Sequence, residues 1–271
     1  MDEPVIYTKP KLGIFDSGVG GFSVLEEIRS VTSADILYFG DCARAPYGNR
    51  SMGEICMFMK EIIANLKLQE VTHFVSACNS MSVTMTDKIL KDSGIENSKY
   101  VDMIKVFKEY VKFDNGSKAI IFGTKATISS GAYQEVLTEK NVEVGQYAFK
   151  TLAGLIERKA SDGDLYEVVS SGMNYAKKIG ATHIIYGCTH YPLISKIFEN
   201  CARDIKWDGE FINPAKYVAK AVSKWNLEGE KNTSFEASEV TYTFKFLSEK
   251  YEIGEKSRTV KSGEVGRGGD R

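Results

Sequence analysis

Neither sign of charge predominates in this sequence of 271 residues, which has 35 lysines and arginines, 36 aspartates and glutamates, and a net charge of −1 at pH 7. Proteins that attract nucleic acid or an anionic membrane over long range usually have a basic excess. The sequence also has no apolar stretch of the eighteen or more residues that a membrane-spanning helix requires. These absences predict a protein that binds neither nucleic acid nor membrane.

Histidine and cysteine are scarce, with three and five residues respectively. No CxxC or HxxxH pair occurs among them, so we expect no metal site. The opening MDEPVIYTKPKLGIF is acidic and lacks the basic segment and apolar run of a signal peptide. We therefore expect a cytoplasmic protein whose cysteines are free thiols. These cysteines are Cys42, Cys56, Cys78, Cys188 and Cys201.

The residues that are abundant indicate a globular protein, since 43% are hydrophobic and 26% charged. This is enough to bury one large core or two domain-sized ones. In the first part of the chain, apolar runs at residues 11–15, 35–39 and 72–78 predict strands. Helices are predicted between them, over residues 22–29 and after Ser51, which begins the Ser-x-x-Glu pattern of a capping box.

The second part of the chain repeats this alternation of strands and helices. Strands are predicted at 118–123 and 182–188, and helices at 128–140 and from a cap at Asp162 to Gly180. Residues 91–117 are polar and mixed, and we expect them to connect two domains. Strands separated by helices of this length predict parallel sheets with right-handed crossovers.

Two segments match each other around a cysteine. The segment VTHFVSACNS (residues 71–80) aligns with ATHIIYGCTH (residues 181–190). Each contains a Thr-His pair, apolar residues, a small residue and then the cysteine. Both Cys78 and Cys188 follow a predicted strand, and open α/β sheets bind ligands at the carboxyl ends of their strands. We therefore expect the two thiols on opposite walls of one cleft between two similar domains.

Two polar loops also follow predicted strands. Residues 16–21, DSGVGG, precede a helix but lack the Lys-Ser/Thr of a P-loop. Their backbone N–H groups suit a phosphate or a small carboxylate, and a tight structural turn is the alternative. Residues 40–51, GDCARAPYGNRS, indicate on their own only a loop at a strand end, where ligands are often held.

The matched thiols point to chemistry that uses both without oxidation. One, as thiolate, removes a proton from one face of a carbon acid, and the other, as thiol, returns a proton to the opposite face. That reaction is a racemisation or epimerisation, and two structural cysteines are the alternative. His190 stands two residues after Cys188 and is a candidate partner of its sulfur, whereas His73 and His183 are expected to be core or sheet-end histidines.

Four motifs in order, GIFDSGVGGFSVL, YFGDCARAPYGNRS, ACNS and GCTHYPLI, resemble those of the cofactor-independent glutamate racemases of bacterial cell-wall synthesis. The resemblance implies an α/β fold of two similar doubly wound parallel-sheet domains facing each other across a central cleft. It implies a first domain of residues 1–95 plus 212–254 and a second of residues 96–211. The charged, glycine-rich tail 255–271 is expected to be disordered.

The resemblance also implies the roles of individual residues. Cys78 and Cys188 would be the catalytic acid/bases, the first acting on D-glutamate and the second on L-glutamate. Asp16, Glu157 and His190 would support the two thiols. No cofactor or metal is implied, because fixed donors would stabilise the charge that develops on the substrate. The residues implied to contact the substrate are Asp16, Ser17, Pro46, Tyr47, Gly48, Asn79, Ser80, Thr124, Thr127, Thr189 and His190.

Three functions are therefore weighed. The first is a glutamate racemase that supplies D-glutamate for peptidoglycan, with a small amino acid as its partner and a homodimer as its assembly. The second is an aspartate racemase or another thiol-pair isomerase, against which DSGVGG and THYPL favour glutamate. The third is a non-catalytic amino-acid-binding or regulatory protein, which would have no reason to keep both thiols.

Overall fold

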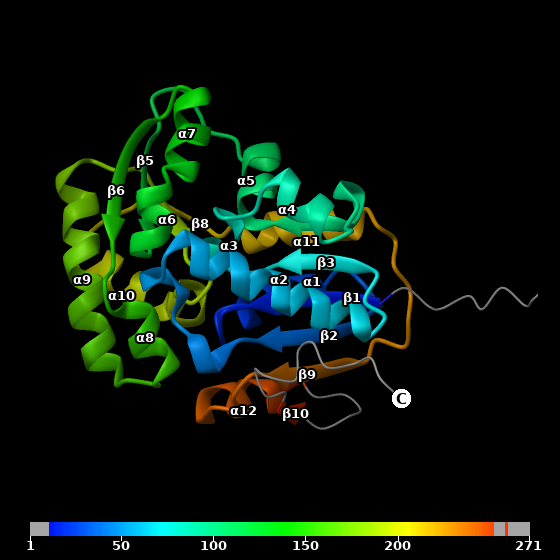
Figure 1. Ribbon diagram of the computed structural model, residues 1–271. Coiled ribbons are helices and arrows are strands. Elements are labelled where there is room, and N and C mark those ends of the chain that lie inside the picture. Colours follow the sequence, from blue (N-terminus) through cyan, green and yellow to red (C-terminus); the bar gives the residue numbers. More distant parts are fainter. Residues whose placement is uncertain (1–10, 252–257, 260–271) are drawn as a thin grey trace, which may run out of the picture.

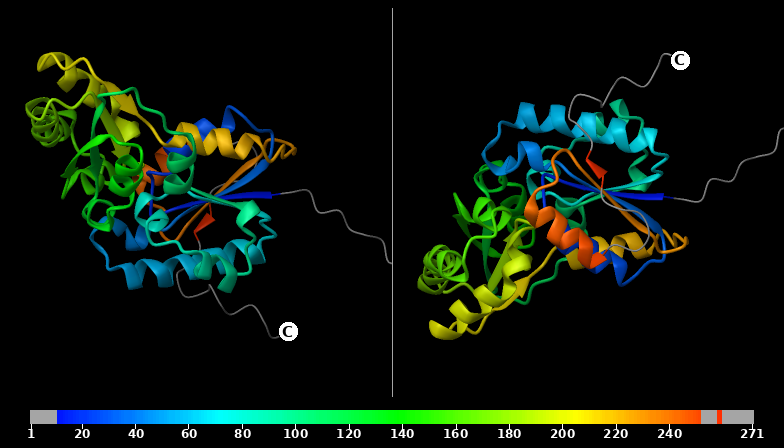
Figure 2. Two further views of the ribbon diagram at one scale, coloured as in Figure 1. Left: turned by 90° about the horizontal axis from the view of Figure 1, so that it is seen from above. Right: turned by 90° about the horizontal axis from the view of Figure 1, so that it is seen from below.

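The computed structural model describes residues 11–251 and 258–259. They form two parallel sheets, each with helices packed on it, so that two α/β domains lie side by side (Figures 1 and 2). The α/β fold class with two parallel-sheet domains, predicted from the sequence, is confirmed. No helix in these residues is long and apolar enough to cross a membrane.

The first sheet has six strands in the order β10-β9-β2-β1-β3-β4. Their bounds are Lys11–Asp16 (β1), Asp35–Gly40 (β2), His73–Ser76 (β3), Tyr100–Asp102 (β4), Thr233–Ala237 (β9) and Arg258–Thr259 (β10). The chain thus returns to this sheet after building the second domain, because β9 pairs in parallel with β2.

The second sheet has four strands in the order β6-β5-β7-β8. Their bounds are Lys118–Gly123 (β5), Glu143–Ala148 (β6), His183–Gly187 (β7) and Glu210–Ile212 (β8). In each sheet the strand that precedes a matched cysteine, β3 or β7, pairs with the first strand of its domain, β1 or β5. The loops that follow these four strands therefore emerge at neighbouring positions.

Twelve α-helices connect or cover the strands in the described residues. They are Phe22–Arg29 (α1), Met52–Leu68 (α2), Asn79–Ser82 (α3), Asp87–Asp92 (α4), Met103–Tyr110 (α5), Lys125–Ser130 (α6), Ala132–Glu139 (α7), Leu152–Glu157 (α8), Asp162–Lys178 (α9), Ser195–Asp204 (α10), Ala215–Ser223 (α11) and Tyr242–Tyr251 (α12). Four short 3-10 turns are Cys42–Arg44 (η1), Tyr47–Asn49 (η2), Asn97–Lys99 (η3) and Tyr191–Ile194 (η4).

Helix starts follow the capping chemistry of the sequence, with two corrections. The capping box at Ser51 is present, and its hydroxyl accepts from the backbone N–H of Glu54 at 3.3 Å. The helix expected over 128–140 is instead two helices, since Gly131 adopts a left-handed φ of 69° between α6 and α7. Helix α9 is capped by Ser161 rather than Asp162, which lies in its first turn.

The prediction that residues 91–117 only connect two domains is wrong. This segment contains β4, which pairs with β3 in the first sheet, and also α5. A strand of three residues is too short to show a periodic pattern, and so the boundary after residue 95 separates β4 from the sheet it completes. Of the tail 255–271, Arg258–Thr259 form a strand beside β9, and the rest lies outside the described residues.

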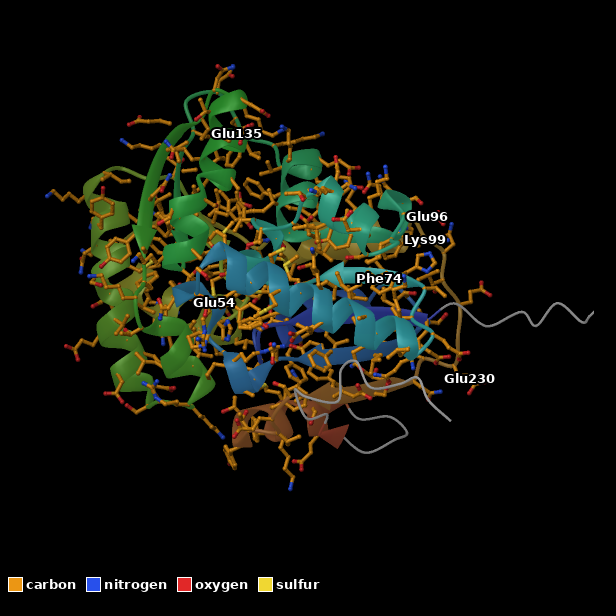
Figure 3. All side chains as sticks on the ribbon, in the orientation of Figure 1. Glu54, Phe74, Glu96, Lys99, Glu135 and Glu230 are labelled. Carbon is orange, nitrogen blue, oxygen red and sulfur yellow. The ribbon has the colours of Figure 1, made fainter. Side chains whose placement is uncertain are left out.

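Each sheet separates two hydrophobic cores, because successive strand residues face opposite sides. Ile14 and Tyr38 pair across β1 and β2 and enter the core beneath α1 and α11. The next pair, Phe15 and Phe39, enters the core beneath α2. Full burial of such a side chain stabilises the fold by about 1.5–3 kcal/mol. Side chains fill the space between each sheet and the helices on its two faces, whereas the exposed side chain of Glu135 points away from these cores (Figure 3).

The sequence repeat around the cysteines is also a structural repeat. Thr72 and Thr182 precede the matched strands, and each hydroxyl bonds to both backbone groups of the lysine that begins the neighbouring strand, at 3.0–3.2 Å. The histidines that follow, His73 and His183, are half-buried and lie against Trp225 and Phe113 respectively. They are sheet-end histidines, as predicted.

Candidate active site

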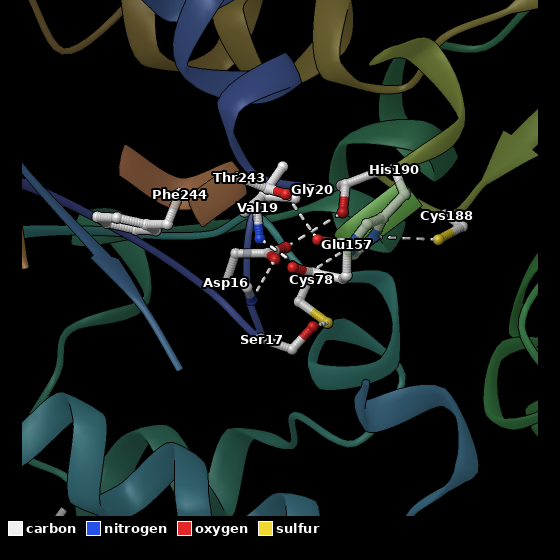
Figure 4. A network of polar contacts seen from close by, with 12 residues as sticks. Asp16, Ser17, Val19, Gly20, Cys78, Glu157, Cys188, His190, Thr243 and Phe244 are labelled. Carbon is white, nitrogen blue, oxygen red and sulfur yellow. Dashed lines mark hydrogen bonds and ion pairs between the residues drawn. The ribbon is translucent and has the colours of Figure 1, made fainter. Parts of the chain in front are cut away.

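The two matched cysteines are buried at the carboxyl ends of their strands. Cys78 follows β3 and caps α3, and 5% of it is exposed. Cys188 follows β7, and 4% of it is exposed. Both lie beside one polar network built from the two domains (Figure 4). All five cysteines are free, as predicted.

The two domains meet directly at this network. Ser23 on α1 donates its hydroxyl proton to the carbonyl of Thr189 at 2.8 Å. The Thr189 hydroxyl in turn donates to the carboxylate of Asp16, at the end of β1, at 3.1 Å. Thr243 on α12 donates to the carbonyl of Glu157, at the end of α8, at 2.7 Å. Since each bond joins one domain to the other, these contacts hold the two cysteine loops in a fixed relation.

Cys188 has a histidine and a carboxylate behind it. Its sulfur lies 3.6 Å from Nδ1 of His190, and Nε2 of the same ring lies 2.7 Å from Oε1 of Glu157. Burial alone would lower the pKa of His190, but the neighbouring Cys188 and Glu157 raise it well above its usual value. This direction favours the charged form of the ring, and an imidazolium so close to the sulfur would stabilise negative charge there.

Cys78 has a different environment. Its thiol donates to the hydroxyl of Ser17 at 3.6 Å. Burial and the neighbouring Asp16 raise the pKa of Cys78 to about 12, so that it rests as a thiol. Burial likewise raises the pKa of Asp16, although its carboxylate accepts from the backbone N–H of Gly18 at 2.8 Å. The two cysteines thus have different neighbours despite their matched positions, since Cys188 lies against His190 and Cys78 against Ser17.

A row of polar groups beside Cys78 can hold a carboxylate. The hydroxyls of Ser80 and Thr124 lie 3.2 Å apart, and that of Thr127 lies 3.2 Å from Thr124. The side-chain nitrogen of Asn79 is buried and has no hydrogen-bond partner among the described residues. A buried donor without a partner is costly, and a bound carboxylate would satisfy it.

The loop that follows β2 packs against the polar groups beside Cys78, through a contact between Gly48 and Thr124. Gly48 packs so tightly on Thr124 that an added Cβ would lie 2.5 Å from the threonine Cβ. Tyr47 is fully buried, and its hydroxyl bonds to Asp41, whereas Pro46 is half-buried before it. Outside the contact lies a pocket of about 380 Å³, whose lining includes Arg50 and Lys125. Two cations therefore flank the outer side of the Gly48–Thr124 contact.

The structure brings together most of the predicted site residues but also adds others. Ser23, Thr243 and Tyr133 make bonds between the domains that the sequence analysis did not assign. Ser23 occupies the last glycine position of the dinucleotide fingerprint, and that substitution was its only signal. Thr243 is distant from every motif in the sequence, and Tyr133 lies in a predicted helix shortly after Thr127, where no local pattern indicates a contact with the other domain.

The part of the chain that the structure describes contains no cluster of side chains suited to bind a metal ion. No group of three or more His, Cys, Asp or Glu side chains there is placed to hold an ion. The histidine nearest to the cysteines, His190, already has both ring nitrogens bonded, to Cys188 and Glu157.

Substituting Gly20 by alanine is expected to reduce turnover at this site about a hundredfold or more. The added Cβ would lie 2.4 Å from the Thr189 hydroxyl and 2.6 Å from Nδ1 of His190, so that one domain must move from the other. Steady-state kinetics would measure this, with Gly53→Ala as the control, since that position has open space around it. Unchanged turnover in Gly20→Ala would contradict the close packing.

Substituting Asp16 by asparagine is expected to raise stability while lowering activity. A folded-state pKa above the unfolded value means that stability is present at low pH and is lost as pH rises through the folded pKa. The neutral amide avoids that loss, so the melting temperature should rise by about 2–4 °C at pH 7 and less at pH 4. Thermal unfolding of this variant and of the exposed control Asp87→Asn tests this, and a lower melting temperature at pH 7 would contradict it.

No protein-family model matches this chain. The chain is, however, 36% identical over 193 residues to the glutamate racemase of Helicobacter acinonychis (strain Sheeba), which covers 70% of this chain and 75% of the relative. The structure of this chain matches that of a glutamate racemase isoform from Bacillus anthracis with a TM-score of 0.82 and 27% identity, over 93% of this chain and 98% of the other. Glutamate racemase from Francisella tularensis, solved in complex with D-glutamate, matches with a TM-score of 0.78 and 26% identity, over 93% and 97%.

Two parallel-sheet α/β domains joined at a site with paired thiols, together with these relatives, define an amino-acid racemase, an isomerase. The similarity to the Helicobacter relative extends over three quarters of that protein. The chain belongs to the glutamate racemase family.

Proposed function

We propose that this protein interconverts L- and D-glutamate by proton transfer between the α-carbon and two thiols, Cys78 and Cys188, without a cofactor. The observation that carries the proposal is the pairing of each buried thiol with its own acid/base group. Cys188 is bonded to His190, which is bonded to Glu157, and Cys78 lies beside Asp16. Two structural cysteines would have no need of such partners.

Proton transfer begins at different thiols for the two enantiomers. With L-glutamate, Cys188 as thiolate takes the α-proton, stabilised by the His190 imidazolium. Cys78, which rests as a thiol, then donates a proton to the opposite face of the α-carbon. Burial favours the protonated form of Asp16, and in this proposal Asp16 returns a proton to Cys78. With D-glutamate the steps run in reverse, and the two thiols titrate as one coupled system.

Fixed hydrogen-bond donors supply the remaining stabilisation. The α-proton of an amino acid is weakly acidic, so negative charge that develops on the substrate carboxylate must be stabilised where it forms. Asn79 supplies an amide nitrogen that has no partner among the described residues, and Ser80 and Thr124 supply hydroxyls beside Cys78. In the proposed complex, Ser17, Thr127 and Thr189 supply further hydroxyls, while Pro46, Tyr47 and Gly48 enclose the substrate.

Glutamate is the substrate we propose, because the motifs of this chain resemble those of glutamate racemases and the similar proteins are glutamate racemases. In addition, the side chains of Arg50 and Lys125 line a pocket beside the site and would attract an anionic substrate. We propose that D-glutamate made here serves peptidoglycan synthesis in the cytoplasm, and that the protein acts as a homodimer. The alternatives are an aspartate racemase or another thiol-pair isomerase, and a non-catalytic amino-acid-binding regulatory protein.

The test is a racemisation assay on the purified full chain without added cofactor. Circular dichroism should show L-glutamate and D-glutamate converging on the same racemic end point, with aspartate much slower. Conversion of aspartate in preference to glutamate would support the second function. An absence of conversion of both, with glutamate bound, would support the non-catalytic protein.

A further inference from the structure

Tyr133 reaches across the domain boundary to a side chain next to Cys78. Its hydroxyl, on α7 of the second domain, donates to the side-chain carbonyl of Asn79, on α3 of the first, at 2.6 Å. Both residues are buried, with 1% of Tyr133 and 2% of Asn79 exposed. The bond therefore forms away from solvent, where a hydrogen bond is electrostatically stronger than in water.

The position of this hydroxyl is set by the core of the second domain. The Tyr133 ring packs edge-on against Phe107 with 4.8 Å between centroids, among the buried side chains of Val136 and Leu137. Burial, with a smaller contribution from Asp102, raises the pKa of Tyr133 well above its usual value. The phenol thus keeps its proton and acts as the donor, so the amide oxygen of Asn79 is the acceptor.

Fixing that oxygen also fixes the amide nitrogen. The carboxamide is planar, so Nδ2 of Asn79 must point away from Tyr133, and there it has no partner among the described residues although it is buried. The backbone of Asn79 has little freedom either, since Cys78 caps the helix that begins at this residue. The hydroxyl of the neighbouring Ser80 lies 3.2 Å from that of Thr124 in the second domain, so two hydroxyls lie next to the Asn79 amide.

We propose that Tyr133 is a positioning residue, which turns the Asn79 amide so that its N–H groups donate to a carboxylate of the amino acid when the two domains are closed. This inference rests on the proposed function. It makes the orientation of a first-domain donor depend on a second-domain hydroxyl. The carboxylate site is then complete only when the two domains are packed together as in this structure.

The experiment is steady-state kinetics of Tyr133→Phe with both enantiomers of glutamate. The substitution keeps the ring and removes only the hydroxyl, so we expect KM to rise and kcat/KM to fall about tenfold, with a smaller change in kcat. Tyr166→Phe is the matched control, since that hydroxyl also makes a 2.6 Å bond, to Asp204, within the second domain and on its surface. Its kinetics should equal those of the wild type.

A double-mutant cycle separates positioning from a general structural effect. Asn79→Ala alone should lower kcat/KM strongly, and adding Tyr133→Phe should then lower it no further, because the group that the hydroxyl positions is gone. Independent, multiplying losses would overturn the inference, as would wild-type kinetics in Tyr133→Phe. In either case an active wild-type protein leaves the proposed function standing. An inactive wild type would overturn both.

Discussion

Replacing Cys78 or Cys188 by serine is expected to lower racemisation of glutamate about 10³-fold or more in each case, without loss of the fold. A serine hydroxyl matches the thiol in shape but is a far weaker acid, so that it can neither take nor give the α-proton at a useful rate. Both sulfurs lie at buried loop positions where an oxygen fits the space. Circular dichroism of glutamate measures the rate, and thermal unfolding verifies the fold.

The two variants should also differ in which enantiomer they still deprotonate. Cys78→Ser retains the Cys188–His190 pair, so any residual exchange of the α-proton with solvent should occur with L-glutamate. Cys188→Ser should show it with D-glutamate only. Cys56→Ser serves as the control, since Cys56 is a half-buried residue of α2, and its activity should be unchanged. Near-normal racemisation in either active-site variant would contradict the two-thiol mechanism.

Replacing Glu157 by glutamine is expected to lower kcat/KM about 10²-fold and to shift its pH dependence. The amide oxygen can still accept from His190 and from the backbone N–H of Val19, the partners of Oε1 at 2.7 and 3.0 Å. The negative charge that helps to raise the pKa of His190 is lost, however. The imidazolium then loses its proton at lower pH, and the alkaline limb of the pH profile should move to lower pH.

Kinetics in both directions test this second prediction. Since the two enantiomers of free glutamate have equal energy, kcat/KM must fall by the same factor for both, while the individual kcat values can differ. Glu139→Gln is the matched control, because Glu139 pairs at 2.8 Å with Lys108 on the surface of the same domain. A Glu157→Gln profile with an unmoved alkaline limb would show that Glu157 does not sustain the charge on His190.

The parts of the fold that sequence reasoning predicts are those with strong local patterns. The apolar runs that become β1, β2, β5 and β7 are central strands buried on both faces, and α1 coincides with its predicted range. The strands that were not predicted are short or lie at or near a sheet edge. β4 and β8 have three residues each, and β6 is a half-exposed edge strand without an apolar run. Their pairing depends on the rest of the sheet, which no local window contains.

The site divides in the same way. Asp16, Cys78 and Cys188 follow strands in recognisable motifs, so their convergence can be predicted from the rule that parallel strands present their carboxyl ends together. The bonds that hold the site together come from residues such as Tyr133 and Thr243, which meet their partners only after the domains pack. The raised pKa values of Cys78 and His190 depend on that packing as well, since they arise from burial and from buried neighbours.

The measurement that tests the two-thiol mechanism most directly is proton NMR of L-glutamate and then D-glutamate with the wild-type protein in deuterated buffer. Two thiols on opposite faces should place solvent deuterium on the α-carbon of the product from the first turnovers, while the remaining substrate keeps its proton, and this should hold from either enantiomer. Product that carries the proton of its own substrate, or early deuterium in substrate and product alike, would mean that a single base serves both faces and would contradict the mechanism.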